Sequence, residues 1–112
     1  MTHQGVTLEW LQDEAHRIAM EHGWWDKQRS ILELLMLVVT EVTEAAEAYR
    51  TWELLEHFGQ HGKPEGFASE LADILIRVGD LAEHYNIDLT KAVQDKMDYN
   101  VTRSWRHGGK LA

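Results

Sequence analysis

Apolar positions recur with the period of an α-helix through most of the chain, and no run alternates with the period of a strand. A first helix is predicted to begin after Thr7, whose hydroxyl can cap it, and to end near Gly23. The buried stripe of this helix is predicted to consist of Leu8, Leu11, Ala15, Ile18 and Ala19. Residues 24–27 then form a connecting loop.

Ser30 and Glu33 have the spacing of a capping box, which predicts the start of a second helix. This helix is expected to run from Ile31 to about Phe58. Its apolar run at residues 34–39 faces every side of the helix, and so small a chain has too few neighbouring helices to cover all of it. We therefore expect a second copy of the chain to cover the remainder.

Pro64 is suited to the first position of a third helix, which is predicted to end at about Tyr85. Asn86 favours a left-handed helix end, and Asp88 can cap a fourth helix that precedes a tail at residues 105–112. The fold class is therefore all-α. We expect the 112 residues to form one domain with a four-helix, bundle-like arrangement.

Two pairs of carboxylates interrupt helix faces that are otherwise apolar. Glu41 and Glu44 are three residues apart and share one face of the second helix. Glu70 and Asp73 have the same spacing on the third helix. Ionised groups on an inward face are costly unless a cation keeps them charged. Four oxygen ligands on two facing helices predict a site for a hard cation, Mg²⁺, with Mn²⁺ as the alternative.

A basic stripe on the fourth helix and one arginine on the third are candidates for binding an anion. Lys96, Asn100 and Arg103 fall on one face, where two cations and an amide can hold phosphate oxygens. The alternative is a polar helix end whose basic residues favour the helix dipole. Arg77, one turn after Asp73, either contacts phosphate or pairs with an acid of the metal site.

Trp24 and Trp25 lie in the loop before the second helix. Aromatic faces stack on nucleobases, which makes the pair a candidate slot for the base of a nucleotide. The alternative is that both rings plug the helix bundle or a subunit contact.

The charge and the cysteine content narrow the class of protein. The net charge of −8 argues against a polynucleotide partner, because such partners are bound by basic surfaces. No stretch approaches the roughly 20 apolar residues that span a bilayer, so no membrane partner is expected. The chain has no cysteine, which fits a reducing compartment, and a cytoplasmic location is the expectation.

Several blocks of the sequence resemble short, single-domain members of the MazG-like nucleotide pyrophosphohydrolases, the all-α NTP pyrophosphatase superfamily. The blocks are residues 22–25, 41–50, 70–77, 96–103 and 107–110, and they contain a Glu-x-x-Glu followed by a Glu-x-x-Asp. The resemblance covers nearly the whole chain. It implies the MazG fold, assembly as a homodimer or homotetramer, and Mg²⁺ bound by the two acidic pairs. Where members of this subgroup often carry Arg-Pro, this chain has Arg103-Ser104.

The resemblance also implies an enzyme, one that hydrolyses a nucleoside triphosphate, often a deoxynucleotide, between its α and β phosphates and so cleans the nucleotide pool. Metal ions activate water for in-line attack in such reactions, and Glu41 or Glu44 is expected to take the proton. Lys96, Asn100 and Arg103 are expected to hold phosphate oxygens. The competing hypotheses are an enzyme like phosphoribosyl-ATP pyrophosphohydrolase and a non-catalytic helical protein that binds a nucleotide or a metal.

Overall fold

The computed structural model describes residues 5–53, 55 and 57–103, so the predicted tail at residues 105–112 lies outside the described part. In chain order its elements are α1 (Leu8–Glu21), a 3₁₀ turn (Trp24–Asp26), α2 (Ile31–Arg50), β1 (His57–Phe58), a second 3₁₀ turn (Gln60–Gly62), β2 (Pro64–Glu65), α3 (Phe67–His84) and α4 (Leu89–Thr102). The all-α class is confirmed within the described residues.

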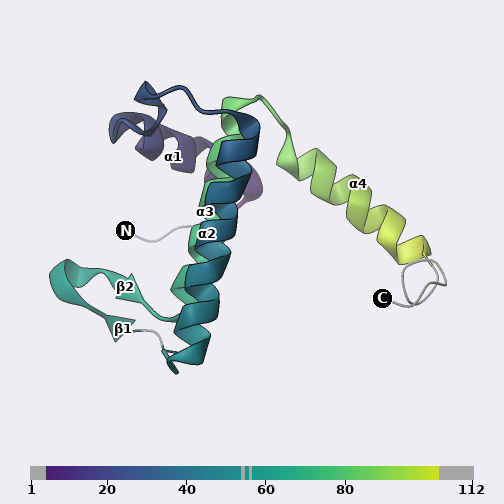
Figure 1. The fold of residues 1–112 in the computed structure, drawn as a ribbon. Coiled ribbons are helices and arrows are strands. Elements are labelled where there is room, and N and C mark those ends of the chain that lie inside the picture. The colour runs from purple at the N-terminus through teal and green to yellow at the C-terminus, as the bar shows by residue number, and fades with distance from the viewer. Residues whose placement is uncertain (1–4, 54, 56, 104–112) are drawn as a thin grey trace.

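Helices α2 and α3 run side by side in opposite directions, and α1 lies across the end of the pair that is nearest to α4 (Figure 1). Small residues allow the helices to approach one another. Gly79 of α3 is buried, and a Cβ atom at this position would lie 3.2 Å from Cγ of Leu11 on α1. The buried apolar side chains are Ala15, Leu34, Ala45, Ala48 and Ala82.

Three of the predicted helix starts are confirmed by their caps. The Thr7 hydroxyl accepts a hydrogen bond from the Trp10 amide at 3.0 Å, and the Ser30 hydroxyl accepts one from the Glu33 amide at 3.1 Å. The Asp88 carboxylate accepts one from the Lys91 amide at 3.0 Å.

Two predicted helix ends are confirmed by their backbone angles. Gly23 follows α1 with a φ of 81°. Asn86 follows α3 with a φ of 57°, as expected for a left-handed helix end.

The prediction that the second helix continues to Phe58 is wrong, because α2 ends at Arg50. Trp52 adopts a left-handed conformation with a φ of 63°, and the Glu53 amide donates a hydrogen bond to the Ala48 carbonyl at 2.8 Å. This closes the helix as a glycine-based C-terminal motif would, but without a glycine to reveal it in the sequence.

A short antiparallel hairpin follows α2 in place of the predicted turn. It pairs His57 with Glu65 and Phe58 with Pro64. Pro64 is therefore a strand residue and not the first residue of the third helix, which begins at Phe67. An edge position in a two-residue strand tolerates a residue that has no amide hydrogen.

Helix α4 leads away from the other three helices (Figure 1). Apart from Leu89 at its start, all of its residues are exposed, and Val101 keeps 82% of its surface accessible. The predicted bundle is therefore not closed within a single chain, although all four helices form. None of the helices in the described ranges combines the length and the apolar character that crossing a membrane takes.

Candidate metal and nucleotide site

Three of the four predicted carboxylates meet between α2 and α3. Glu41 and Glu44 from α2 and Glu70 from α3 each offer an oxygen atom, and these atoms lie within 4.8 Å of one another. The i, i+3 spacing turns both α2 carboxylates toward α3, because Leu34, Ala45 and Ala48 bury the same side of the helix. We call these three residues the carboxylate cluster.

The cluster holds negative charge that the described residues do not fully compensate. Burial, and then the charges of Asp73, Glu44 and Glu41, raise the pKa of Glu70 above its ordinary value. Oε2 of Glu70 is buried and has no hydrogen-bond partner among the described residues. A buried oxygen without a partner, beside further carboxylates, fits a hard divalent cation such as Mg²⁺.

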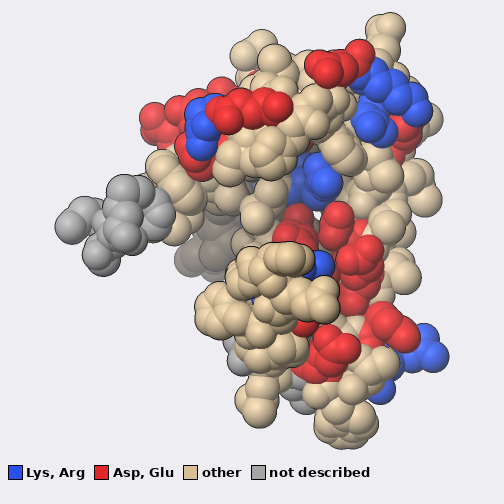
Figure 2. Space-filling model, turned by 90° about the vertical axis from the view of Figure 1, so that its left-hand side faces the viewer, with Lys and Arg blue, Asp and Glu red and all other residues tan. Residues whose placement is uncertain are grey.

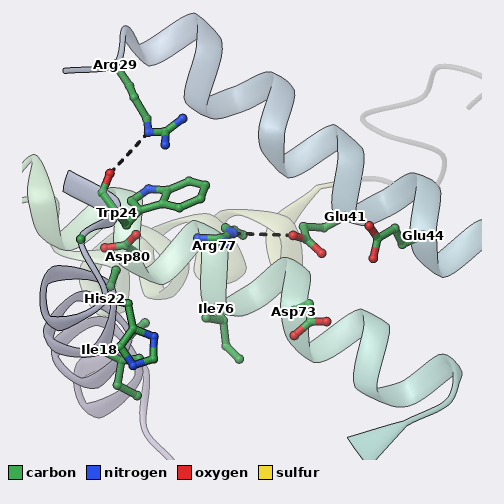
Figure 3. Close-up of a pocket in the computed structure, with 13 residues that line it drawn as sticks. Ile18, His22, Trp24, Arg29, Glu41, Glu44, Asp73, Ile76, Arg77 and Asp80 are labelled. Atoms are coloured by element: carbon green, nitrogen blue, oxygen red, sulfur yellow. Dashed lines mark hydrogen bonds and ion pairs between the residues drawn. The ribbon is translucent and has the colours of Figure 1, made fainter. Parts of the chain in front are cut away.

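Asp73, the fourth predicted ligand, lies one turn after Glu70 on α3. Its carboxylate is outside the cluster. It lines a pocket that Glu41 and Glu44 also line, and it lies across from them (Figure 3). The fold thus brings the four acids to one place. Three of them are close enough to share one cation, and Asp73 lies beside them.

Glu41, Glu44 and Asp73 form one wall of a pocket of about 680 Å³, within the size range of small-molecule sites. Acidic side chains gather around a hollow in the middle of the molecule, with basic side chains beside it (Figure 2). Helix α1 and the turn after it supply the opposite wall. The pocket is lined by Ala15, Ile18, Ala19, His22, Gly23, Trp24, Arg29, Glu41, Glu44, Asp73, Ile76, Arg77 and Asp80.

Arg77 connects the carboxylate cluster to Trp24. Its Nε lies 3.6 Å from Oε1 of Glu41, and its guanidinium lies 3.7 Å from the centre of the Trp24 ring (Figure 3). The guanidinium of Arg29 also lies over this ring, at 4.2 Å. Arg77 is thus paired with Glu41, one of the acids that were predicted to bind metal. Its place on the pocket wall leaves a phosphate contact open as well.

Trp25 does not line this pocket. Its ring stacks on His84 with centroids 3.6 Å apart, and its Nε1 donates a hydrogen bond to Oδ1 of Asp80 at 2.8 Å. Oδ1 of the same carboxylate, which is only 2% exposed, also lies 2.8 Å from Nδ1 of His16. In the single chain Trp25 thus packs between α1 and α3, which agrees with the alternative prediction that the ring fills space in the helix bundle. Of the two tryptophans, Trp24 lines the pocket.

Of the three residues of the predicted stripe, Lys96 and Asn100 lie on α4, whereas Arg103 follows the last helical residue with an extended backbone. The stripe is not brought to the acids. An Nη of Arg103 donates a hydrogen bond to Oδ1 of Asn100 at 3.2 Å, and Lys96 and Arg103 both lie near the Tyr99 ring. None of the α4 residues lines the pocket described above. Among the described residues, Arg77 lies beside Glu41, the charge of Lys63 acts on Glu70, and Arg29 lines the pocket farther from the cluster.

Several pocket residues were not predicted as site residues. Asp80 carried a signal, because positions 70, 73, 77 and 80 continue one polar line along α3. Ile18 was assigned to the buried stripe of the first helix, yet it borders the pocket. Arg29 gave no signal, because it stands outside any helix period, directly before the cap of α2.

No protein-family model matches the chain, and no curated protein matches it.

Proposed function

We propose that this protein is a Mg²⁺-dependent nucleoside triphosphate pyrophosphohydrolase that cleaves between the α and β phosphates. The observation that carries the proposal is the carboxylate cluster, two of whose members, Glu41 and Glu44, line a pocket of nucleotide size, and whose third, Glu70, has a buried oxygen without a partner among the described residues. This combination supplies hard-cation ligands where a phosphate chain can reach them. The sequence resemblance supports the same reaction and favours a deoxynucleotide as substrate.

In this proposal Glu41, Glu44, Glu70 and Asp73 hold Mg²⁺, which when bound neutralises phosphate charge and acidifies the attacking water. Either Glu41 or Glu44 accepts the proton of that water as general base, and Glu44 is the more exposed of the two. Arg77 lies beside Glu41 and binds a phosphate oxygen. The pocket wall from α1 holds the nucleoside and limits the access of bulk water.

We further propose that the active form is a homodimer or homotetramer. Large apolar side chains on the outer face of α2 are exposed, Leu32 at 75% and Met36 at 62%. Apolar residues of α4 are exposed as well, among them Val93 and Met97. Such surfaces are typical of subunit interfaces. A second copy packed on α2 brings an α4 stripe within reach of a pocket that lacks it in the single chain.

The interface is tested by Leu35→Asp, which puts a charge into the exposed apolar face of α2. We expect this variant to be monomeric by light scattering. Wild type should stay oligomeric, and so should the control Met20→Asp, which puts the same charge at an exposed apolar position of α1, away from α2 and α4. A monomeric wild type would contradict the assembly.

The activity is tested by measuring pyrophosphate release from a panel of ribo- and deoxynucleoside triphosphates and phosphoribosyl-ATP, with and without Mg²⁺. We expect release that requires the metal, with deoxynucleotides among the best substrates. Release from phosphoribosyl-ATP alone would assign the protein to that competing activity. Binding of Mg²⁺ and nucleotide without turnover would make it a non-catalytic binding protein. The cytoplasm, as a reducing compartment, remains the predicted location.

A further inference from the structure

Trp24 separates two positive charges in the pocket. Arg29 and Arg77 lie over its ring at 4.2 and 3.7 Å from the ring centre. In Figure 3 the Arg29 side chain approaches the indole from one side and the Arg77 side chain from the other, so the two guanidinium groups flank the ring. Both faces of Trp24 are therefore covered by cations, and the ring is not a free stacking surface for a nucleobase.

Other contacts hold the two arginines in this position. Arg29 is only 17% exposed and donates from Nε to the Trp24 carbonyl at 3.5 Å and from an Nη to Oε2 of Glu33 at 3.1 Å. Arg77 is held by Glu41. A guanidinium carries five N–H donors in a planar fork, so each arginine keeps donors beyond those that these contacts engage. Both side chains line the pocket.

We propose that Arg29, Trp24 and Arg77, which we call the arginine bracket, form the subsite for the leaving pyrophosphate. This assignment rests on the proposed function and adds to it which part of the pocket takes which part of the nucleotide. Planar guanidinium forks bind phosphate oxygens in pairs, and two forks separated by one ring match an anion with two phosphate groups. Arg77 contacts Glu41, which sets the bracket directly beside the metal ligands where cleavage occurs.

The rest of the pocket suits the nucleoside. Ile18 from α1 and His22 directly after it lie side by side, with Ile76 of α3 facing them, and all three are apart from Arg29 (Figure 3). An apolar surface with one polar ring is suited to a sugar and a base and offers little to a pyrophosphate. The pocket thus has a cationic arm for the leaving group and a largely apolar arm for the monophosphate.

Binding of pyrophosphate should require Mg²⁺. The pocket lining contains four acids, Glu41, Glu44, Asp73 and Asp80, and only the two arginines of the bracket as fixed cations. An anion that enters without metal therefore meets net negative charge. In this arrangement Trp24 is a positioning residue, because it contributes no charge and keeps the two guanidinium groups apart and aligned.

The test is calorimetric binding of pyrophosphate, in the presence of Mg²⁺, to the intact protein and its variants, compared with binding of a deoxynucleoside monophosphate. We expect Arg29→Ala and Arg77→Ala each to weaken pyrophosphate binding at least about tenfold and to change monophosphate binding less than about twofold. Trp24→Ala should weaken pyrophosphate binding to a similar extent, and Trp24→Phe should recover most of the loss because a flat ring is retained.

The matched control is Arg17→Ala. Arg17 carries the same charge but pairs with Glu14 and Glu21 on the exposed side of α1 and does not line the pocket. Its loss should leave both affinities unchanged. Thermal melting of every variant separates a loss of binding from a loss of folding.

The proposal is overturned if wild type does not bind pyrophosphate with Mg²⁺. It is equally overturned if Arg29→Ala binds pyrophosphate like wild type, or if it loses pyrophosphate and monophosphate binding in equal measure. Failure of the proposed function gives a different result. If the protein binds pyrophosphate through the bracket but releases none from any triphosphate, the subsite proposal holds and the proposed hydrolase activity is wrong.

Discussion

The two charged regions of this molecule differ in how much of a site one chain can build. The α2–α3 pair brings four acids together at one pocket, three of them on its wall, with an arginine beside Glu41. Helix α4 and the residue after it carry two cations and an amide, yet α4 lies exposed and these residues contribute nothing to that pocket. The acids thus depend on contacts within the chain, whereas the stripe needs a contact that the single chain does not supply.

This difference separates two kinds of sequence signal. The i, i+3 spacing of acids predicts a site when the helix that carries them has a buried side, as α2 does through Leu34, Ala45 and Ala48. The same reasoning applied to α4 predicts which polar residues lie close together, but it cannot predict what they contact. The reason is that α4 has no buried residue to fix its orientation. A residue pattern along a helix predicts which side chains share one face of that helix. The packing of the helix determines which other residues that face contacts.

The largest expected effect comes from removing a charge from the acids. Glu41→Gln and Asp73→Asn should each reduce pyrophosphate release at least about a hundredfold, because stabilisation by a bound metal contributes several kcal/mol to the transition state. Melting temperatures should be unchanged or higher, since each change relieves repulsion among carboxylates. Glu47→Gln, an exposed acid of α2 outside the pocket, is the control and should keep full activity. Unchanged turnover in both site variants would remove the metal assignment.

The next effect concerns the stripe. Lys96→Ala and Arg103→Ala should each lower activity by about tenfold or more, and by equal factors on every nucleotide, because hydrogen bonds to charged groups contribute about 1.5–3 kcal/mol and phosphates are common to all substrates. Lys91→Ala, which removes a cation paired with Asp95 on the same helix, is the control. A loss that depends strongly on the base would reassign the stripe to base recognition.

Mixing two inactive variants then tests where the stripe acts. If α4 of one copy serves the pocket of another in a dimer, refolding Asp73→Asn and Arg103→Ala chains together should restore about a quarter of wild-type activity, since half of the dimers then hold one intact site. If the stripe serves the pocket of its own chain, no intact site forms and activity stays lost.

A smaller effect is expected from the metal alone. A ligand that binds only the native state stabilises it by about 2.7 kcal/mol at a concentration one hundred times its Kd. For a chain of this length, each kcal/mol raises the melting temperature by about 4 °C. We therefore expect millimolar Mg²⁺ to raise the melting temperature of wild type by several degrees and that of Glu41→Gln by much less. No shift in wild type, with or without nucleotide, would count against the site.

The smallest effect is a pH dependence without metal. The raised pKa of Glu70 means that the native state binds more protons than the unfolded chain as pH rises from the ordinary value of 4.5 toward the raised one. Stability of the metal-free protein should therefore fall as pH increases through this window. Glu70→Gln should flatten that part of the profile, and Mg²⁺ should offset the loss in wild type. Parallel profiles for wild type and Glu70→Gln, from chemical denaturation, would contradict the cause assigned to this pKa.

The elements and the acids of the site could be predicted where local chemistry determines them. Thr7, Ser30 and Asp88 cap their helices by hydrogen bonds within three residues, which the sequence contains in full. The end of α2 could not be predicted, because it depends on Trp52 in a left-handed conformation that bulky residues rarely adopt.

The two tryptophans show that the residues of the pocket were also only partly predictable from the sequence. Trp24 and Trp25 are adjacent and equivalent in the sequence, yet one lies between two arginines and the other stacks on His84. The partners that distinguish them lie on α1, on α3 and in the loop before α2, and most of these are tens of residues away or outside any periodic pattern. Arg29 was missed for the same reason.

In the proposed reaction, water attacks the α phosphorus beside the carboxylate cluster. The decisive measurement is hydrolysis of a deoxynucleoside triphosphate with Mg²⁺ in water labelled with heavy oxygen, followed by mass spectrometry of the products. We expect the label in the monophosphate and an unlabelled pyrophosphate, because bound Mg²⁺ and the arginine bracket would stabilise pyrophosphate as the leaving group. Label in the pyrophosphate, or nucleoside diphosphate and inorganic phosphate as products, would contradict it.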